Sequence, residues 1–128
     1  MAKKLTREKY QSKTQPLTNQ KANLFQISIS PSLEKKYNFS KLNNNNGNQE
    51  FQRFLNDTIM KRLTIVEVEN QFLRTKGKPS SSEKIDGAVR DIFHFGKDRK
   101  ALRVFGYYDE NGYFLITALD TNHKKQKG

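Results

Sequence analysis

Three side chains in the last part of the sequence have the chemistry needed to act on a phosphodiester: Arg103, Tyr107 and His123. An arginine can neutralise the charge that develops on a phosphate in a transition state. A histidine, lysine or tyrosine can transfer a proton, for a rate gain of roughly 10²–10⁴-fold. Clustered cations would hold a polyanion beside these groups, and the candidates are Lys97, Arg99, Lys100, Lys124, Lys125 and Lys127.

Other kinds of catalysis fit the sequence poorly. The chain has no cysteine and only two histidines, which excludes thiol chemistry and a clustered zinc site. It has no glycine-rich phosphate loop and no nucleophile elbow. Its late carboxylates are spread through a basic setting instead of converging on a magnesium ion. The sequence therefore predicts no metal and no cofactor, and favours chemistry on RNA, whose 2′-OH is a built-in nucleophile.

The net charge of +11 predicts a polyanionic partner: nucleic acid, a ribosome, an acidic protein or an anionic membrane surface. The charge is uneven, at +5 for residues 1–21, +4 for 22–85 and +2 for 86–128. The last third is thus modestly charged in total. Its cations are clustered, however, and clustering can build a local positive potential.

Length and composition predict a single domain with a tail. A chain of 128 residues with 34% hydrophobic residues has room for one core. We expect residues 1–22 to be a basic, flexible tail, with a phosphate-binding arm as the functional alternative, and residues 23–128 to form the domain. No apolar run reaches the ~20 residues of a membrane span. The N-terminus also lacks the apolar stretch of a secretory signal, so a cytoplasmic protein without a membrane partner is expected.

The first half of the domain predicts one strand and up to three helices. Residues 24–30 alternate as a half-buried strand does, and Ser30-Pro31 suggests a short helix through Tyr37. An asparagine-rich loop follows. Residues 50–62 are amphipathic, and Thr64 with Glu67 matches a capping box, so we expect two helices with a break at Thr64, although the β-branched residues there also suit a strand. Residues 78–85 are expected to be a loop.

Three strands are expected in the last third, at residues 89–95, 101–108 and 113–119. Asn111-Gly112 suits a two-residue hairpin turn, which would pair Tyr108 with Leu115 and Arg103 with Asp120. One face would then be apolar and suited to burial, with Leu102, Val104, Tyr108, Leu115 and Leu119. The other would mix aromatic with charged groups and suit a ligand, with Arg103, Phe105, Tyr107, Ile116 and Asp120.

The expected order is therefore β-α-α-β-β-β. Segregated strands and helices indicate an α+β fold, in which an antiparallel C-terminal sheet packs against two or three helices on one face.

The C-terminal residues resemble a known family. The stretch Leu102-Arg-Val-Phe-Gly-Tyr-Tyr-Asp-Glu-Asn-Gly-Tyr-Phe-Leu-Ile-Thr-Ala-Leu, followed by Asp120-Thr-Asn-His-Lys-Lys-Gln-Lys127, resembles the closing hairpin of RelE/HigB toxins from bacterial toxin–antitoxin systems. Residues 24–37, 76–79 and 86–93 resemble the family's opening strand and helix, its loop after the helical pair and its next strand. The resemblance spans about residues 24–127.

The resemblance implies a RelE-like fold, endoribonucleolytic cleavage of mRNA, often on the ribosome, and neutralisation by a cognate antitoxin. It matches Arg103 to the family's phosphate-binding arginine, His123 to an acid/base position, and Lys124 to the start of the lysine-rich end. These three are the expected catalytic residues. The expected RNA-binding residues are Lys97, Arg99, Lys100, Tyr107, Lys125 and Lys127. The chain departs from the family in its long N-terminal tail and in lacking a tyrosine after His123.

Structural roles remain open for the same residues. Arg103 can simply pair with Asp120 across the hairpin, and Tyr107 can pack in a core. His94 can be a satisfied histidine of the sheet, and Glu83 is a less favoured candidate for a base. Lys97, Arg99 and Lys100 can belong to a solvated turn, and His123 to an ordinary chain end.

Two functions of other kinds are compatible with the sequence. One is a non-catalytic basic protein that binds RNA or a ribosome on the same fold. The other is a DNA-binding regulator, which is less favoured because the sequence has no recognition-helix signature.

Overall fold

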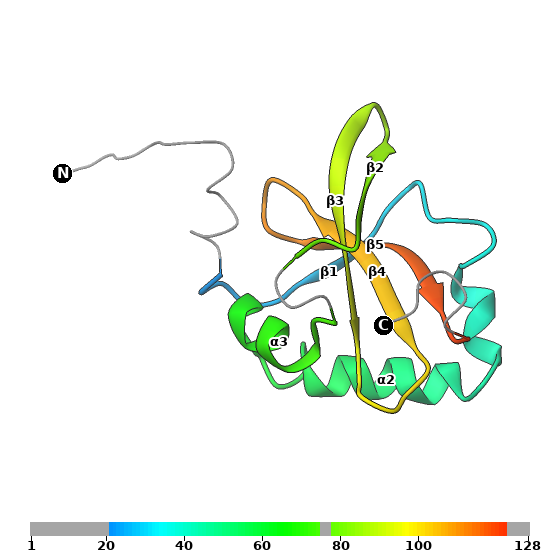
Figure 1. Ribbon diagram of the computed structural model, residues 1–128. Helices are drawn as coiled ribbons and strands as arrows, with labels where there is room; N and C mark the ends of the chain where they lie inside the picture. The colour runs from blue at the N-terminus through cyan, green and yellow to red at the C-terminus, as the bar shows by residue number, and fades with distance from the viewer. Residues whose placement is uncertain (1–20, 75–77, 123–128) are drawn as a thin grey trace.

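The computed structural model describes residues 21–74 and 78–122 and has an α+β architecture (Figure 1). The elements are β1 (Ile27–Ile29), the 3₁₀ helix η1 (Phe39–Asn43), α2 (Gly47–Asp57), α3 (Ile65–Phe72), β2 (Ser81–Ile85), β3 (Ala88–Gly96), β4 (Arg103–Tyr108) and β5 (Phe114–Asp120). The five strands form a mixed sheet in the order β1-β5-β4-β3-β2. β1 runs parallel to β5, and the other neighbours are antiparallel.

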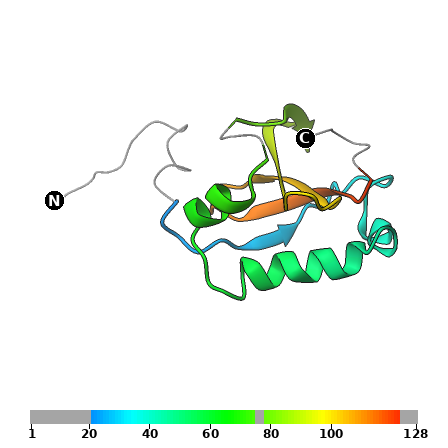
Figure 2. The same ribbon diagram turned by 60° about the horizontal axis from the view of Figure 1, so that its bottom comes forward.

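The sheet has two differently covered sides. α2 and α3 pack on one side, which we call the helix face, and the β2–β3 hairpin lies on the opposite side, the hairpin face (Figure 2). β3 connects the two, because its last four residues pair with β4 while its first five pair with β2. The N-terminal half of β3 is thereby free to bend away from β4.

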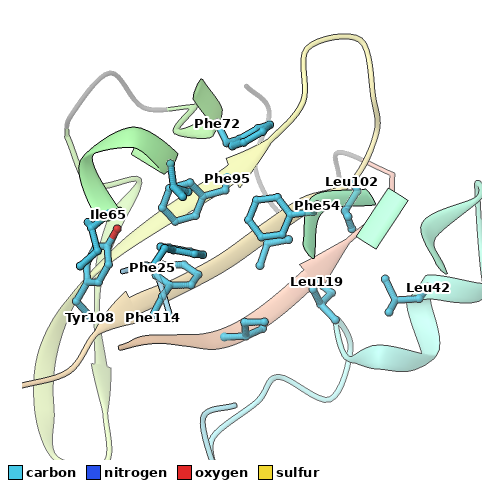
Figure 3. Packing of buried hydrophobic residues seen from close by; sticks show 13 residues of the cluster. Phe25, Leu42, Phe54, Ile65, Phe72, Phe95, Leu102, Tyr108, Phe114 and Leu119 are labelled. Atoms are coloured by element: carbon cyan, nitrogen blue, oxygen red, sulfur yellow. The ribbon is translucent and has the colours of Figure 1, made fainter. Parts of the chain in front are cut away.

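The main core lies under the helix face and is rich in phenylalanine. Phe25, Phe54, Phe95 and Phe114 meet in mutual ring contacts, with centroids 4.9–6.4 Å apart (Figure 3). They come from the entry to β1, from α2, from β3 and from β5. Each buried ring contributes about 1.5–3 kcal/mol through its apolar area. This cluster therefore ties the two ends of the described chain to the helices.

The helix break at Thr64 is present as predicted. The Thr64 side chain accepts a bond from the Glu67 backbone N–H, and the Glu67 carboxylate accepts one from the Thr64 N–H. The capping box satisfies backbone donors that the first turn of α3 cannot pair internally. Residues 58–62 between the helices form turns.

The predicted helix from Pro31 through Tyr37 was wrong, because this segment bonds chiefly to β5 and makes a turn bond, from the Leu33 N–H to the Ser30 carbonyl, in place of helical bonds. The N–H groups of Ser30 and Glu34 donate to the carbonyls of Ile116 and Thr117, and the Leu119 N–H donates to the carbonyl of Tyr37. The segment forms turns and bends, and a 3₁₀ helix follows at Phe39–Asn43, capped by the Asn38 side chain.

The predicted loop at residues 78–85 was also wrong in its second half, where β2 forms. Asp86 and Gly87 both have positive φ angles, 51° and 85°, and connect Ile85 to Ala88 as a two-residue hairpin turn. Polar side chains dominate β2, as expected for an edge strand with one solvated side.

The register of the last hairpin differs from the prediction at one end. Arg103 pairs with Asp120 as predicted, but Tyr108 pairs with Phe114, because a bulge shifts the register between Phe105 and Gly106. The turn spans Glu110, Asn111 and Gly112, a three-residue loop in place of two. The shift places Ile116 in the main core and Leu115 on the hairpin face, the reverse of the prediction.

Candidate functional site

The predicted ligand surface is the hairpin face, and its centre is a second small core. Phe105 and Tyr107 of β4 pack there against Ile85 and Ile92 of the β2–β3 hairpin and against Ala118. Strand alternation places Arg103 on the same face. The prediction of an open aromatic and charged surface was therefore wrong for these side chains, because it assigned the covering strand β2 to a loop.

Arg103 is only 3% exposed and is held by the main chain of the β3–β4 loop. Its Nη1 donates to the carbonyl of Lys100 at 2.6 Å and to that of Leu102 at 2.8 Å. The pKa of Arg103 is lowered, chiefly by burial and to a smaller extent by the nearby positive charge of Arg74. The carboxylates of Asp98, Glu50 and Asp120 act in the opposite direction. An arginine stays charged under such shifts, so the site holds a fixed, partly desolvated cation.

The β3–β4 loop brings three predicted cations near Arg103. Lys97, Arg99 and Lys100 are all exposed. The Lys97 ammonium pairs with Asp57 of α2 at 3.4 Å. Arg99 has a positive φ of 66°, as one residue of this tight turn. The loop thus combines a buried guanidinium, fixed through its carbonyls, with exposed charges of the same sign.

Tyr107 lies on the same face but points into the second core, and it is 5% exposed. The guanidinium of Arg90 covers its ring, 4.8 Å from the centroid. A base could stack on Tyr107 only if Arg90 moved aside. The packing role that the sequence left open for this tyrosine is the one the structure describes.

His94 is a buried titratable group beside Phe105 on the hairpin face. It is 1% exposed, its ring stacks on Phe105 with centroids 4.7 Å apart, and its Nδ1 shares a short hydrogen bond with the Ser80 hydroxyl. Glu83 lies on β2, where its carboxylate accepts a bond from the Ser81 hydroxyl at 3.1 Å. His94 therefore lies on a strand that the sequence predicted, β3, and Glu83 on the strand that it missed, β2.

Several site residues lie outside the described part of the chain: His123, Lys124, Lys125 and Lys127. Their predicted roles stay predictions. Arg90 and Ser80 were not predicted as residues of the site. The Asp86-Gly87 dipeptide between two short alternating runs was the signal that would have placed both on a hairpin.

Charge is nearly balanced over residues 21–74 and 78–122, which carry 15 Lys/Arg against 12 Asp/Glu. Of the net charge of +11, eight units therefore belong to the rest of the sequence. The described surface is mildly basic, and the β3–β4 loop is one of its positive segments.

Within the described ranges, no three His, Asp or Glu side chains are arranged to hold a metal ion. No helix of this part is long and apolar enough to cross a membrane. Comparison with protein-family models, with curated proteins and with solved structures finds no match to the chain.

Proposed function

We propose that the chain is an endoribonuclease toxin of the RelE type that cleaves mRNA without a metal and is neutralised by an antitoxin. The observation that supports it best is the position of Arg103. This arginine follows the helical pair and lies on the penultimate strand, as the family resemblance implies, with its guanidinium fixed beside the basic β3–β4 loop.

The proposed reaction uses the RNA's own 2′-OH. The hydroxyl loses its proton and its oxygen attacks the adjacent phosphorus, while the bond to the 5′-oxygen breaks and that oxygen takes up a proton. The products are a 2′,3′-cyclic phosphate and a 5′-hydroxyl end. Arg103 would stabilise the charge on the phosphorane, and His123 and Lys124 would handle the protons.

Contacts with RNA phosphates other than the reacting one would come from two clusters of lysine and arginine side chains. Lys97, Arg99 and Lys100 belong to the β3–β4 loop, and Lys125 and Lys127 extend the basic end of the sequence. Tyr107 would take part only after displacement of Arg90. Such contacts are largely independent of sequence and weaken with salt.

The first experiment measures cleavage of a labelled RNA by the full-length chain in EDTA. We expect cyclic-phosphate products, no cleavage where a 2′-deoxynucleotide replaces the scissile ribose, and a decrease of roughly 10²–10³-fold in rate for Arg103→Lys. Lys35→Ala, an exposed loop residue, is the matched control and should cleave as wild type. If free and ribosome-bound mRNA both stay intact with wild type, the enzyme proposal is refuted.

A second function, non-catalytic binding of RNA or a ribosome, is favoured by one specific observation. Arg103 and Tyr107 are almost fully buried, so the two most specific candidates do not face solvent. This alternative predicts salt-dependent affinity for RNA without cleavage, and the same labelled RNA distinguishes the two.

A further inference from the structure

The β2–β3 hairpin covers two aromatic rings in the middle of the hairpin face. Phe105 and Tyr107 are separated by one residue on β4, so both side chains point to this face, where they are 1% and 5% exposed. Figure 2 shows the hairpin lying over the sheet on the side opposite α2. Its apolar residues Ile85 and Ile92 belong to the same buried cluster as the two rings. The hairpin is therefore what keeps these rings from solvent.

Side chains, and not backbone bonds, hold most of the hairpin to the sheet. β3 pairs with β4 from Phe93 to Gly96, whereas its earlier residues, Ala88 to Ile92, pair with β2. Within residues 21–74 and 78–122, no backbone hydrogen bond joins β2 or these earlier residues to β4 or β5. The hairpin can therefore swing about the junction at Phe93 while the pairing of the main sheet stays intact.

An exposed hydrogen bond fastens the tip of the hairpin. The Ser32 hydroxyl, in the segment between β1 and η1, donates to the Asp86 carboxylate at 2.7 Å. Both residues are exposed, so water can replace this bond at little cost. The contact has the properties of a reversible latch.

Arg90 occupies the place that a stacked base would take on Tyr107. Its planar guanidinium lies over the ring, 4.8 Å from the centroid. Its Nε is buried without a hydrogen-bond partner in the described part of the chain, which is unfavourable for a charged donor. Glu83 is the register partner of Arg90, so the same side of the hairpin also carries a carboxylate. Moving the hairpin aside would open the Nε to water and take this carboxylate away from the sheet.

The covered surface has the chemistry of a site for single-stranded RNA. Aromatic rings on a central strand of an antiparallel sheet can stack on unpaired bases with little dependence on sequence. The ring of His94 stacks on Phe105 and extends the row that Phe105 and Tyr107 begin. Arg103 lies on the same face, but Asp120 is its register partner. Stacking, more than net charge, would therefore supply the affinity at this place.

We propose that the β2–β3 hairpin is a lid over an RNA-stacking surface of Phe105 and Tyr107, and that single-stranded RNA binds there after the lid opens. The inference rests on the RNA-binding part of the proposed function and not on cleavage. Opening exposes Ile85 and Ile92, so the closed form predominates in the free protein. The apparent affinity for RNA is then reduced by the fraction of molecules that are open.

The test joins the lid to the sheet at its latch, in a chain that has no cysteine of its own. Ser32→Cys combined with Asp86→Cys is treated with dibromobimane, a short reagent that links two neighbouring thiols. The probe is a short fluorescein-labelled 2′-O-methyl oligouridylate, which 2′-OH attack cannot cleave. We expect the joined form to bind about tenfold or more weakly than the same double variant capped with iodoacetamide.

Arg90→Ala separates a lid from a simple charge effect by the sign of the change. Loss of a cation alone weakens the binding of a polyanion, whereas loss of the group that covers Tyr107 should tighten binding severalfold. Lys84→Ala is the charge-matched control, because Lys84 is an exposed residue of the same hairpin. It should not tighten binding, and thermal unfolding checks that both variants fold.

Hydrogen exchange detects the opening itself. RNA should speed amide exchange in residues 81–92, because a two-stranded hairpin released from the sheet is only marginally stable. An RNA that binds without moving the lid would leave this exchange unchanged or slow it.

Three results would overturn the proposal. One is equal binding by the joined and capped forms, and another is binding that Arg90→Ala weakens or leaves unchanged. The third is absence of binding by wild type and also by Ser32→Ala combined with Arg90→Ala, which would refute RNA binding as well. If the lid behaves as expected on this probe while ribose RNA stays intact, the lid is supported and only the ribonuclease is refuted.

Discussion

Glu69 is the residue around which the start of the described chain is organised. Its two carboxylate oxygens have different partners: Lys21 forms an ion pair with one, and the Tyr108 hydroxyl donates to the other at 2.9 Å. Tyr108 is largely buried, and burial raises its pKa well above the ordinary value, with the charge of Glu69 and the hydrogen bond acting in the same direction. This tyrosine therefore stays neutral and keeps donating.

Tyr108→Phe should lower the free energy of unfolding by about 1–2 kcal/mol, because a hydrogen bond to a charged group is removed while the ring still packs. Urea denaturation at pH 7 measures the change. Tyr113→Phe is the control: Tyr113 is 44% exposed, and its hydroxyl accounts for little stability.

The same pair predicts a pH dependence. Because the pKa of Tyr108 is raised in the folded state, its contribution to the free energy of unfolding is fully present below the unfolded pKa of about 10. This contribution is lost as the pH rises toward the folded pKa. The stability difference between wild type and Tyr108→Phe should hold from pH 7 to 9 and shrink above pH 10. A difference that stays constant to pH 11 would contradict the assignment.

For single residues, the sequence predicted which residues pair across the strands better than it predicted which side chains face solvent. Period-2 alternation and the hairpin placed Arg103 opposite Asp120 correctly. Whether Arg103 and Tyr107 face solvent depends on the elements packed over them, and local periodicity carries no information about those. Both side chains were expected at a surface and are buried.

Among the elements, the bulge between β4 and β5, whose extra residue is Thr117 of β5, has the largest effect on the site. Gly106 lies where β5 approaches closely: a Cβ there would be 2.1 Å from the carbonyl oxygen of Leu115 and 2.8 Å from the Phe114 ring. Only glycine allows the register shift at this point. The shift decides which side chains of β5 enter the main core and which face the hairpin.

Gly106→Ala should destabilise the fold by about 3 kcal/mol or more, because backbone would have to move to relieve the overlap. Gly87→Ala, in the β2–β3 turn, meets no atom within 4 Å and should cost only about 1 kcal/mol for its positive φ. Thermal unfolding of both variants gives the comparison, and equal decreases in stability would argue against the bulge geometry.

The elements that were predicted correctly from the sequence are those whose signals depend only on neighbouring residues. The capping box at Thr64 needs only two side chains and the local backbone, and it is present. The short helix after Ser30 failed because its backbone groups bond to β5, distant in sequence. β2 was missed because Ser81–Ile85 has a single apolar residue, Ile85, which is too few to show a period.

In the molecule as a whole, most of the net charge belongs to residues outside the part of the chain that the structure describes. Residues 21–74 and 78–122 carry a net charge of only +3, whereas residues 1–20 carry five Lys/Arg and one Glu. Composition predicted the polyanionic partner but could not say which part of the molecule would attract it. The N-terminal cations should add affinity without specificity.

Replacing Lys3, Lys4, Arg7, Lys9 and Lys13 by glutamine should weaken RNA binding at low salt and leave thermal stability unchanged. The slope of log K against log salt should become less negative by about 0.7 for each RNA phosphate that the variant no longer neutralises. Filter binding of a single-stranded RNA across a series of salt concentrations measures the slope. An unchanged slope would mean that these cations do not contact RNA.

The parallel pairing of β1 with β5 also governs when the protein can fold during its synthesis. Phe25 and β1 have no sheet partner until Phe114 and the rest of β5 have left the ribosome, which at ordinary elongation rates takes roughly 5–20 s. Until then the phenylalanines of the main core are without their partners in β5. The native sheet is therefore assembled late and from distant segments, a high-contact-order route that favours slow folding.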